Sequence, residues 1–150
     1  MPQEDVLQLF WTGHAGFCEE SSIVKTFVPN GQLRRFSFEL PVGARGPLRL
    51  APGSRPYYGQ IESILVTALG ASGAPGSGFV ASLTGADAFA SLAAANDIIP
   101  IPADGAYRFI SLGTDPQLLV SVALSNDQHI QHVVEVTLRL WEDSRDALFG

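Results

Sequence analysis

Arginine and tyrosine side chains gather in one short segment of an otherwise acidic chain. Five of the nine basic residues lie between residues 34 and 55, and two tyrosines follow directly. An arginine guanidinium can bind a carboxylate through two parallel hydrogen bonds, and a tyrosine offers a flat apolar ring with a polar tip. Such rings beside polar groups suit the C–H faces and hydroxyls of sugars. The segment therefore predicts a carbohydrate-binding surface formed by Arg49, Arg55, Tyr57 and Tyr58.

A second interpretation of the same residues needs no ligand. Arginines are mostly exposed in folded proteins, so they could form an ordinary solvated face while the two tyrosines cover an edge of the fold. The two tryptophans, Trp11 and Trp141, are embedded in apolar runs. We expect both in the core or at its rim and not on a ligand surface.

The sequence lacks the usual motifs for metal binding, nucleophilic catalysis and phosphate binding. The histidines at 129 and 132 are three apart, which would place them on opposite faces of a strand. No second ligand pair follows His14 and Cys18 at zinc-finger spacing. No nucleophile elbow or phosphate-binding loop is present. The sequence predicts no metal, no cofactor and no enzyme; an unrecognised enzyme would need a pocket with carboxylates of perturbed acidity.

Composition excludes several classes of protein. The chain has 150 residues, of which 46% are hydrophobic and only 16% charged, so it can form a core and is not expected to be disordered. Its net charge of −6 argues against binding to nucleic acid or to anionic membranes. No run approaches the ~20 apolar residues of a membrane span. The acidic N-terminus lacks the features of a signal peptide, so we expect a cytoplasmic protein.

The sequence pattern indicates that these residues lie on or between β-strands. The run from Ile130 to Trp141 alternates apolar and polar residues throughout, which is typical of a strand with one face buried. Shorter alternating runs recur upstream at spacings near ten residues, with turn signals between them. The pattern predicts one all-β domain over residues 1–150, a two-sheet antiparallel β-sandwich of jelly-roll type with at most one short helix.

Four local features carry further predictions. The runs Ser22–Val28 and Leu33–Leu40, separated by Pro29-Asn30-Gly31, form the clearest hairpin candidate. Between Gln60 and Leu69 the polar face changes phase at Glu62 and Ser63, which fits a β-bulge. Residues 70–78 are rich in Gly, Ala and Ser and indicate a flexible connection. Residues 85–96 favour a short helix by propensity, with a weak strand and loop as the alternative.

Two stretches carry a resemblance to a known family. Residues 36–41, 48–53 and 60–66 resemble, in order, β-sandwich segments of bacterial polysaccharide-synthesis glycosyltransferases. A later stretch, Leu112 to Leu118, resembles a second element of that family, in which a strand precedes an Asp-Pro turn. The resemblance spans about residues 33–124. Ala51 stands where the first turn of the family usually carries Asp, so the role of that carboxylate is missing here.

The resemblance implies a non-catalytic accessory module, because no glycosyltransferase catalytic domain fits into 150 residues beside these strands. Its expected partners are an oligosaccharide or a glycosyltransferase domain. A second hypothesis is a protein-interaction or oligomerisation module without a small ligand, in which the long C-terminal strand lies at a sheet edge and pairs with another chain.

Overall fold

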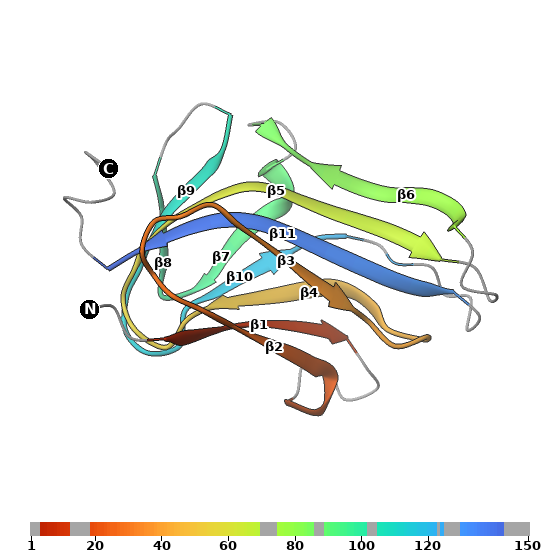
Figure 1. The fold of residues 1–150 in the computed structure, drawn as a ribbon, viewed down its shortest axis with the longest axis horizontal. Helices are drawn as coiled ribbons and strands as arrows, with labels where there is room; N and C mark the ends of the chain where they lie inside the picture. Colours follow the sequence, from red (N-terminus) through yellow and green to blue (C-terminus); the bar gives the residue numbers. More distant parts are fainter. Residues whose placement is uncertain are drawn as a thin grey trace.

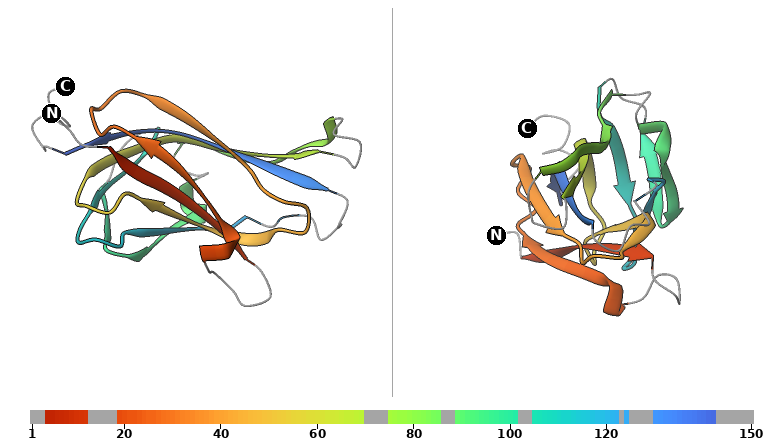
Figure 2. Two further views of the ribbon diagram at one scale, coloured as in Figure 1. Left: turned by 60° about the horizontal axis from the view of Figure 1, so that its bottom comes forward. Right: turned by 90° about the vertical axis from the view of Figure 1, so that its right-hand side faces the viewer.

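The chain folds into two antiparallel β-sheets that pack face to face (Figure 1). The computed structural model describes residues 4–12, 19–69, 75–85, 89–101, 105–122, 124 and 130–142. The two layers are seen end-on in the right view of Figure 2. The predicted fold class, an all-β two-sheet sandwich, is confirmed.

The smaller sheet has five strands and the larger sheet six. The smaller sheet contains, from edge to edge, β2 (Ser22–Phe27), β1 (Asp5–Thr12), β4 (Arg45–Pro52), β10 (Gln117–Val120) and β7 (Leu92–Asn96). The larger sheet contains, from edge to edge, β3 (Arg34–Glu39), β11 (Gln131–Trp141), β5 (Tyr58–Leu69), β9 (Tyr107–Ser111) and β8 (Ile98–Ile101). The sixth strand, β6 (Pro75–Leu83), pairs with the second half of β5.

Alternation along the strands builds the core. In β11 every second side chain from His132 to Leu140 is buried, and the residues between them are partly exposed. The facing layer contributes Leu7 and Leu9 from β1, and β3 contributes Phe38, all at most 1% exposed. Burial of this apolar surface between the sheets is the main source of stability. Trp11 and Trp141 are 9% and 7% exposed, as expected for the core or its rim.

The predicted bulge in β5 is confirmed. Thr137 of β11 lies opposite Ser63, whereas the next residue, Leu138, lies opposite Ile61, so Glu62 is the extra residue. The bulge keeps Ile61 and Ile64 both buried, although they are three residues apart. It thereby maintains the apolar inner face of β5 across the change of phase.

The predicted hairpin between residues 22–28 and 33–40 is wrong. β2 pairs with β1 in the smaller sheet, whereas β3 pairs with β11 in the larger one. The chain therefore crosses from one layer to the other through residues 28–33, as the orange segment of Figure 1 shows. Gly31 (φ +78°) packs directly against the indole of Trp141 in this crossing. Turn chemistry at Pro29-Asn30-Gly31 is equally compatible with either path.

Two other expectations are corrected in part. The expected flexible connection at 70–78 ends in a strand, because β6 begins at Pro75; residues 70–74 lie outside the described residues. Within 85–96, the 3-10 turn η2 (Phe89–Ser91) is followed by strand β7 (Leu92–Asn96), so the second half of this segment is not a helix; residues 86–88, within the range of the expected short helix, lie outside the described residues. A second 3-10 turn, η1 (Glu19–Ser21), precedes β2.

The long C-terminal strand does not lie at an edge. β11 pairs with β3 on one side and β5 on the other. An oligomer formed by adding a strand to β11 is therefore excluded, because both of its backbone edges are already hydrogen-bonded. The edge strands β2 and β8 expose Val24 and Ile99, each 48%.

Candidate functional site

Arg49 lies on the outer face of the smaller sheet. It stands opposite Phe10 of β1 and Leu119 of β10 in the strand register. Its guanidinium carbon lies 4.4 Å from the centroid of the Phe10 ring, a cation–π distance. Phe10 is only 5% exposed although it faces away from the core. The arginine thus helps to shield an outward-facing aromatic ring.

Arg55 and Tyr57 belong to a polar network in the loop between β4 and β5, which we call the Asp5 network. The Tyr57 hydroxyl donates to Asp5 Oδ2 at 2.5 Å and accepts from Arg55 Nε at 3.0 Å. Asp5 Oδ2 also accepts from the Ser54 amide, and Asp5 Oδ1 accepts from the Ser54 hydroxyl, each at 2.9 Å. Arg55 reaches further to Glu142 beyond the end of β11, with 3.2 Å between Nη1 and Oε1. The network joins the first strand, the loop and the last strand.

The ring of Tyr57 is part of the core. The side chain is 1% exposed and meets Phe27 edge-to-face, with 5.7 Å between ring centroids. Its backbone exchanges hydrogen bonds with Ser111. A sugar needs an accessible ring face for stacking, and Tyr57 presents none. Its burial therefore does not fit the stacking role expected from the sequence, and its contacts assign it to the framework of the fold.

Burial and hydrogen bonding set the acidity of this network. Burial by itself would raise the pKa of Asp5, but hydrogen bonds from Ser54, Tyr57 and Val6 outweigh it and hold the pKa below the ordinary aspartate value. The pKa of Tyr57 is raised, mainly by burial and then by its hydrogen bond to the carboxylate. The pKa of Arg55 is raised, chiefly by its hydrogen bond to Tyr57. Asp5 is therefore a stable anion at neutral pH.

Tyr58 faces the opposite way from Tyr57, because neighbouring strand residues point to opposite faces. It is half-buried on the outer face of the larger sheet, opposite Ile110 of β9 and Trp141 of β11. The four residues predicted to form one surface are thus distributed over three places. Arg49 lies outside one sheet, Tyr58 lies outside the other, and Arg55 with Tyr57 lies in the loop between them.

A set of polar side chains does accompany Tyr58. Gln60 of β5 stands opposite Arg108 of β9 on one side and Arg139 of β11 on the other. Glu62, the bulge residue, accepts a hydrogen bond from Gln60 Nε2, and its Oε1 lies 4.0 Å from Arg139 Nε. All four side chains are half-buried. We call Arg108, Gln60 and Arg139 the polar row; it spans neighbouring strands β9, β5 and β11 (Figure 1).

Sequence reasoning missed the polar row, although part of its signal was present. Tyr58, Gln60 and Glu62 follow one another at a spacing of two, so they had to share one face of a strand. The arginines come from strands about 50 and 80 residues further along the chain, as their numbers show. Nothing local indicates that β9 and β11 flank β5, so the row could not be assembled without the strand order.

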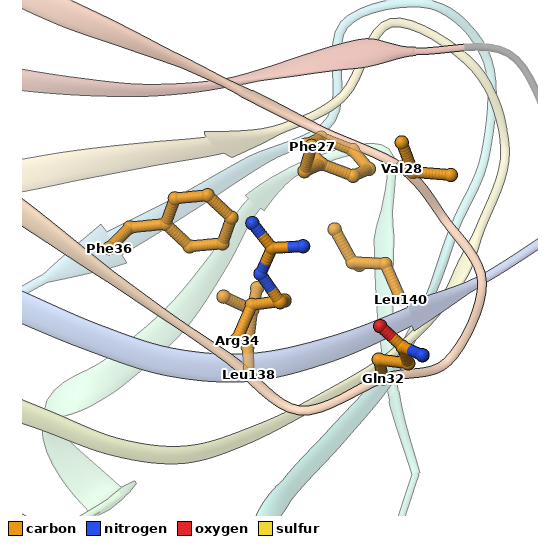
Figure 3. A pocket seen from close by; sticks show the side chains of 7 residues that line it. All are labelled: Phe27, Val28, Gln32, Arg34, Phe36, Leu138 and Leu140. Carbon is orange, nitrogen blue, oxygen red and sulfur yellow. The ribbon is translucent and has the colours of Figure 1, made fainter.

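A small pocket opens at the seam between the two edge strands β2 and β3 (Figure 3). Its walls come from both sheets and from the crossing segment, and Arg34 extends over its apolar floor. It is lined by Phe27, Val28, Gln32, Arg34, Phe36, Leu138 and Leu140. The cavity measures about 10 Å³, roughly the room that one water molecule needs. A sugar ring does not fit there.

The described residues offer little for metal binding. Within the described ranges, no group of three His, Cys, Asp or Glu side chains could hold an ion. His132 is 1% exposed, and burial lowers its pKa. His14, Cys18 and His129 lie outside the described residues. In the part of the chain that the structure describes, no helix is long and apolar enough to cross a membrane.

Comparisons with known proteins return no relative for this chain. No family model, no curated protein and no solved structure matches it.

Proposed function

We propose that the protein is a non-catalytic, carbohydrate-associated β-sandwich module of the glycan-assembly machinery. The glycan lies across the outer face of the larger sheet, over the polar row and beside Tyr58. The observation that carries this proposal is the polar row itself: donor and acceptor side chains on three neighbouring strands, next to a half-buried tyrosine.

The chemistry of the row suits sugar hydroxyls. The Gln60 amide can donate and accept, the guanidinium groups of Arg108 and Arg139 donate, and the neighbouring Glu62 accepts. The Tyr58 ring contributes an apolar surface beside them. All of these residues stand on paired strands and not on loops, so little conformational freedom is lost on binding. Two strand spacings of ~4.8 Å make the row roughly 10 Å wide, which suits an extended ligand on an open surface.

The link to glycan assembly rests on the resemblance of residues 33–124 to segments of polysaccharide-synthesis glycosyltransferases. A glycosyltransferase domain is accordingly the expected protein partner, and the cytoplasm the expected location. In this proposal Tyr58 alone stacks against a sugar ring, whereas the sequence predicted stacking by both Tyr57 and Tyr58. Arg108 and Arg139 donate the hydrogen bonds that the sequence assigned to Arg49 and Arg55.

The proposal is tested by titrating a panel of neutral and acidic oligosaccharides into the protein and following its amide resonances by NMR. We expect shifts to concentrate around Tyr58, Gln60 and Arg139. Gln60→Ala should weaken binding at least about 10-fold, which is 1.4 kcal/mol. Gln8→Ala is the matched control, because Gln8 lies on β1, outside the other sheet, where its amide donates to Ser22. A panel that shifts no resonance near Tyr58 and Gln60, or a Gln8 variant that alone loses binding, would overturn the proposal.

The alternative, an oligomerisation module, now depends on the edge strands. β2 and β8 expose Val24 and Ile99, but Lys25 and Pro100 stand next to them. A charge or a proline on an edge strand opposes pairing with another chain. Light scattering tests this alternative, because an oligomerisation module must self-associate in solution. A stable oligomer in which Tyr58 and Gln60 become protected would favour the alternative.

A further inference from the structure

The outer face of the larger sheet separates its charges along the strands. At one end, Arg108 and Arg139 stand in the polar row, and Arg35 of β3 stands opposite Thr137 in the next outward-facing row of β11. At the other end, Glu135 lies opposite Ser37, and Val133 lies opposite Glu39. The arginines therefore occupy the half that contains Tyr58, and these glutamates occupy the other half.

Among the residues that the structure describes, the arginine half carries more positive than negative side chains. Its carboxylate, Glu62, already accepts from Gln60 and lies 4.0 Å from Arg139 Nε. Among the outward-facing residues that the structure describes in this half, three arginines stand with one glutamate, a balance of +2 on a protein whose net charge is −6. The Glu62 and Arg139 side chains are 33% and 37% exposed, so both can be reached by a ligand. The excess lies beside the ring that the proposed function assigns to sugar stacking.

Neutral sugars do not require such an excess. Their hydroxyls are satisfied by amides and carboxylates such as Gln60 and Glu62, which donate and accept without net charge. A carboxylate is different, because a guanidinium fork binds it through two parallel hydrogen bonds. Arg108 and Arg139 flank Gln60 at one strand spacing each, about 4.8 Å. Side chains as long as arginine can therefore converge on a group held above Gln60.

We infer that the glycan bound at the polar row is acidic, with the carboxylate of a uronic-acid residue held between Arg108 and Arg139 and its ring against Tyr58. The inference rests on the proposed function and adds the class of sugar. A singly charged carboxylate fits better than a phosphate, because Glu62 lies beside the arginines and would repel a dianion more strongly. Towards the other half of the face, Glu135 and Glu39 would repel a second acid, so the acidic sugar is oriented along the strands.

The test compares ligands that differ only in charge. Tri-galacturonic and tri-glucuronic acid are titrated into the protein beside their methyl esters, which keep the sugar ring and lose the carboxylate charge. We expect at least one acid to bind about 10-fold or more tightly than its ester. We also expect its affinity to fall when salt is raised, since exposed charges are screened.

Variants separate this inference from the proposed function. Arg139→Gln and Arg108→Gln should bring the acid-to-ester affinity ratio towards 1, whereas Arg45→Gln, an exposed arginine on β4 of the other sheet, should leave it unchanged. Two arginine variants are used because Arg139 Nη1 also donates to the Gly31 carbonyl at 3.3 Å. An ester or a neutral glycan that binds at the row as tightly as the acid overturns the inference and leaves the proposed function intact. If no member of the whole panel binds at the row, both fail.

Discussion

Replacing Tyr57 with phenylalanine removes one hydroxyl and leaves a ring of the same shape in the core. The hydroxyl donates to Asp5 Oδ2 at 2.5 Å and accepts from Arg55 Nε at 3.0 Å. The edge-to-face contact with Phe27 should persist, since the ring itself is unchanged. The substitution therefore isolates the contribution of one hydrogen bond to a buried carboxylate.

The magnitude follows from the charge and burial of the acceptor. The Asp5 side chain is 5% exposed, and a hydrogen bond to a charged group contributes about 1.5–3 kcal/mol. Asp5 keeps its hydrogen bonds from the Ser54 amide, the Ser54 hydroxyl and the Val6 amide, so the carboxylate is not left unsatisfied. We therefore expect Tyr57→Phe to lower the free energy of unfolding by about 2 kcal/mol at neutral pH.

The loss should depend on pH in a defined direction. Because the pKa of Asp5 is lowered by folding, its stabilisation is complete above the unfolded-state value, about 3.9, and is lost as the pH falls through the folded-state value. Removing one donor raises the folded-state pKa of the variant towards the unfolded one. The difference in stability between wild type and Tyr57→Phe should therefore shrink as the pH is lowered from 7 to about 2.

Urea denaturation followed by tryptophan fluorescence measures this difference, since Trp11 and Trp141 are both buried. Tyr107→Phe is the matched control: Tyr107 packs against Phe89 and Phe109, and its hydroxyl makes no hydrogen bond to any described residue. The control should change stability by less than about 0.5 kcal/mol. If the Tyr57→Phe protein is as stable as wild type, or if its loss of stability is the same at every pH, the hydrogen bond to Asp5 does not stabilise the fold as described.

Three further outcomes follow from the packing. Gly31→Ala should lower the free energy of unfolding by about 1–3 kcal/mol, because Gly31 has a positive φ and an added Cβ would collide with the indole of Trp141. Gly43 also has a positive φ but has open space around it, so Gly43→Ala should lower the free energy of unfolding less in the same urea titration. Phe38→Ala removes a fully buried ring and should lower the free energy of unfolding by about 3–5 kcal/mol. Because burial lowers the pKa of His132, the folded protein resists its protonation; stability should fall as the pH drops below about 6.5, and less so in His132→Leu.

Much of the local structure could be predicted because it has a local cause. Alternation of apolar and polar residues requires only that one face of a strand be buried, so the runs Gln60–Leu69 and Ile130–Trp141 lie close to the observed bounds of β5 and β11. The bulge at Glu62 was predictable for the same reason, since a break of phase between Ile61 and Ile64 cannot be accommodated by a regular strand.

The site was less predictable because it depends on contacts between distant residues. Tyr57 and Tyr58 are neighbours in the chain, yet one is 1% exposed in the core and the other lies on the outer face of a sheet. Their clustering with Arg49 in the sequence implied proximity that the fold does not preserve. The arginines that do accompany Tyr58 arrive on β9 and β11 through strand pairing.

The amino-acid sequence alone indicates that this chain forms strands, where most of them lie and which side chains share one face of a strand, because these properties follow from a period of two. The partner of each strand, in contrast, depends on contacts between distant parts of the chain. Pro29-Asn30-Gly31 reverses or redirects the chain equally well, and the choice between a hairpin and a crossing to the other layer is made by which sheet buries the apolar face of β3. That choice rests on contacts between residues up to about 100 positions apart, as between β3 and β11, which no local pattern encodes.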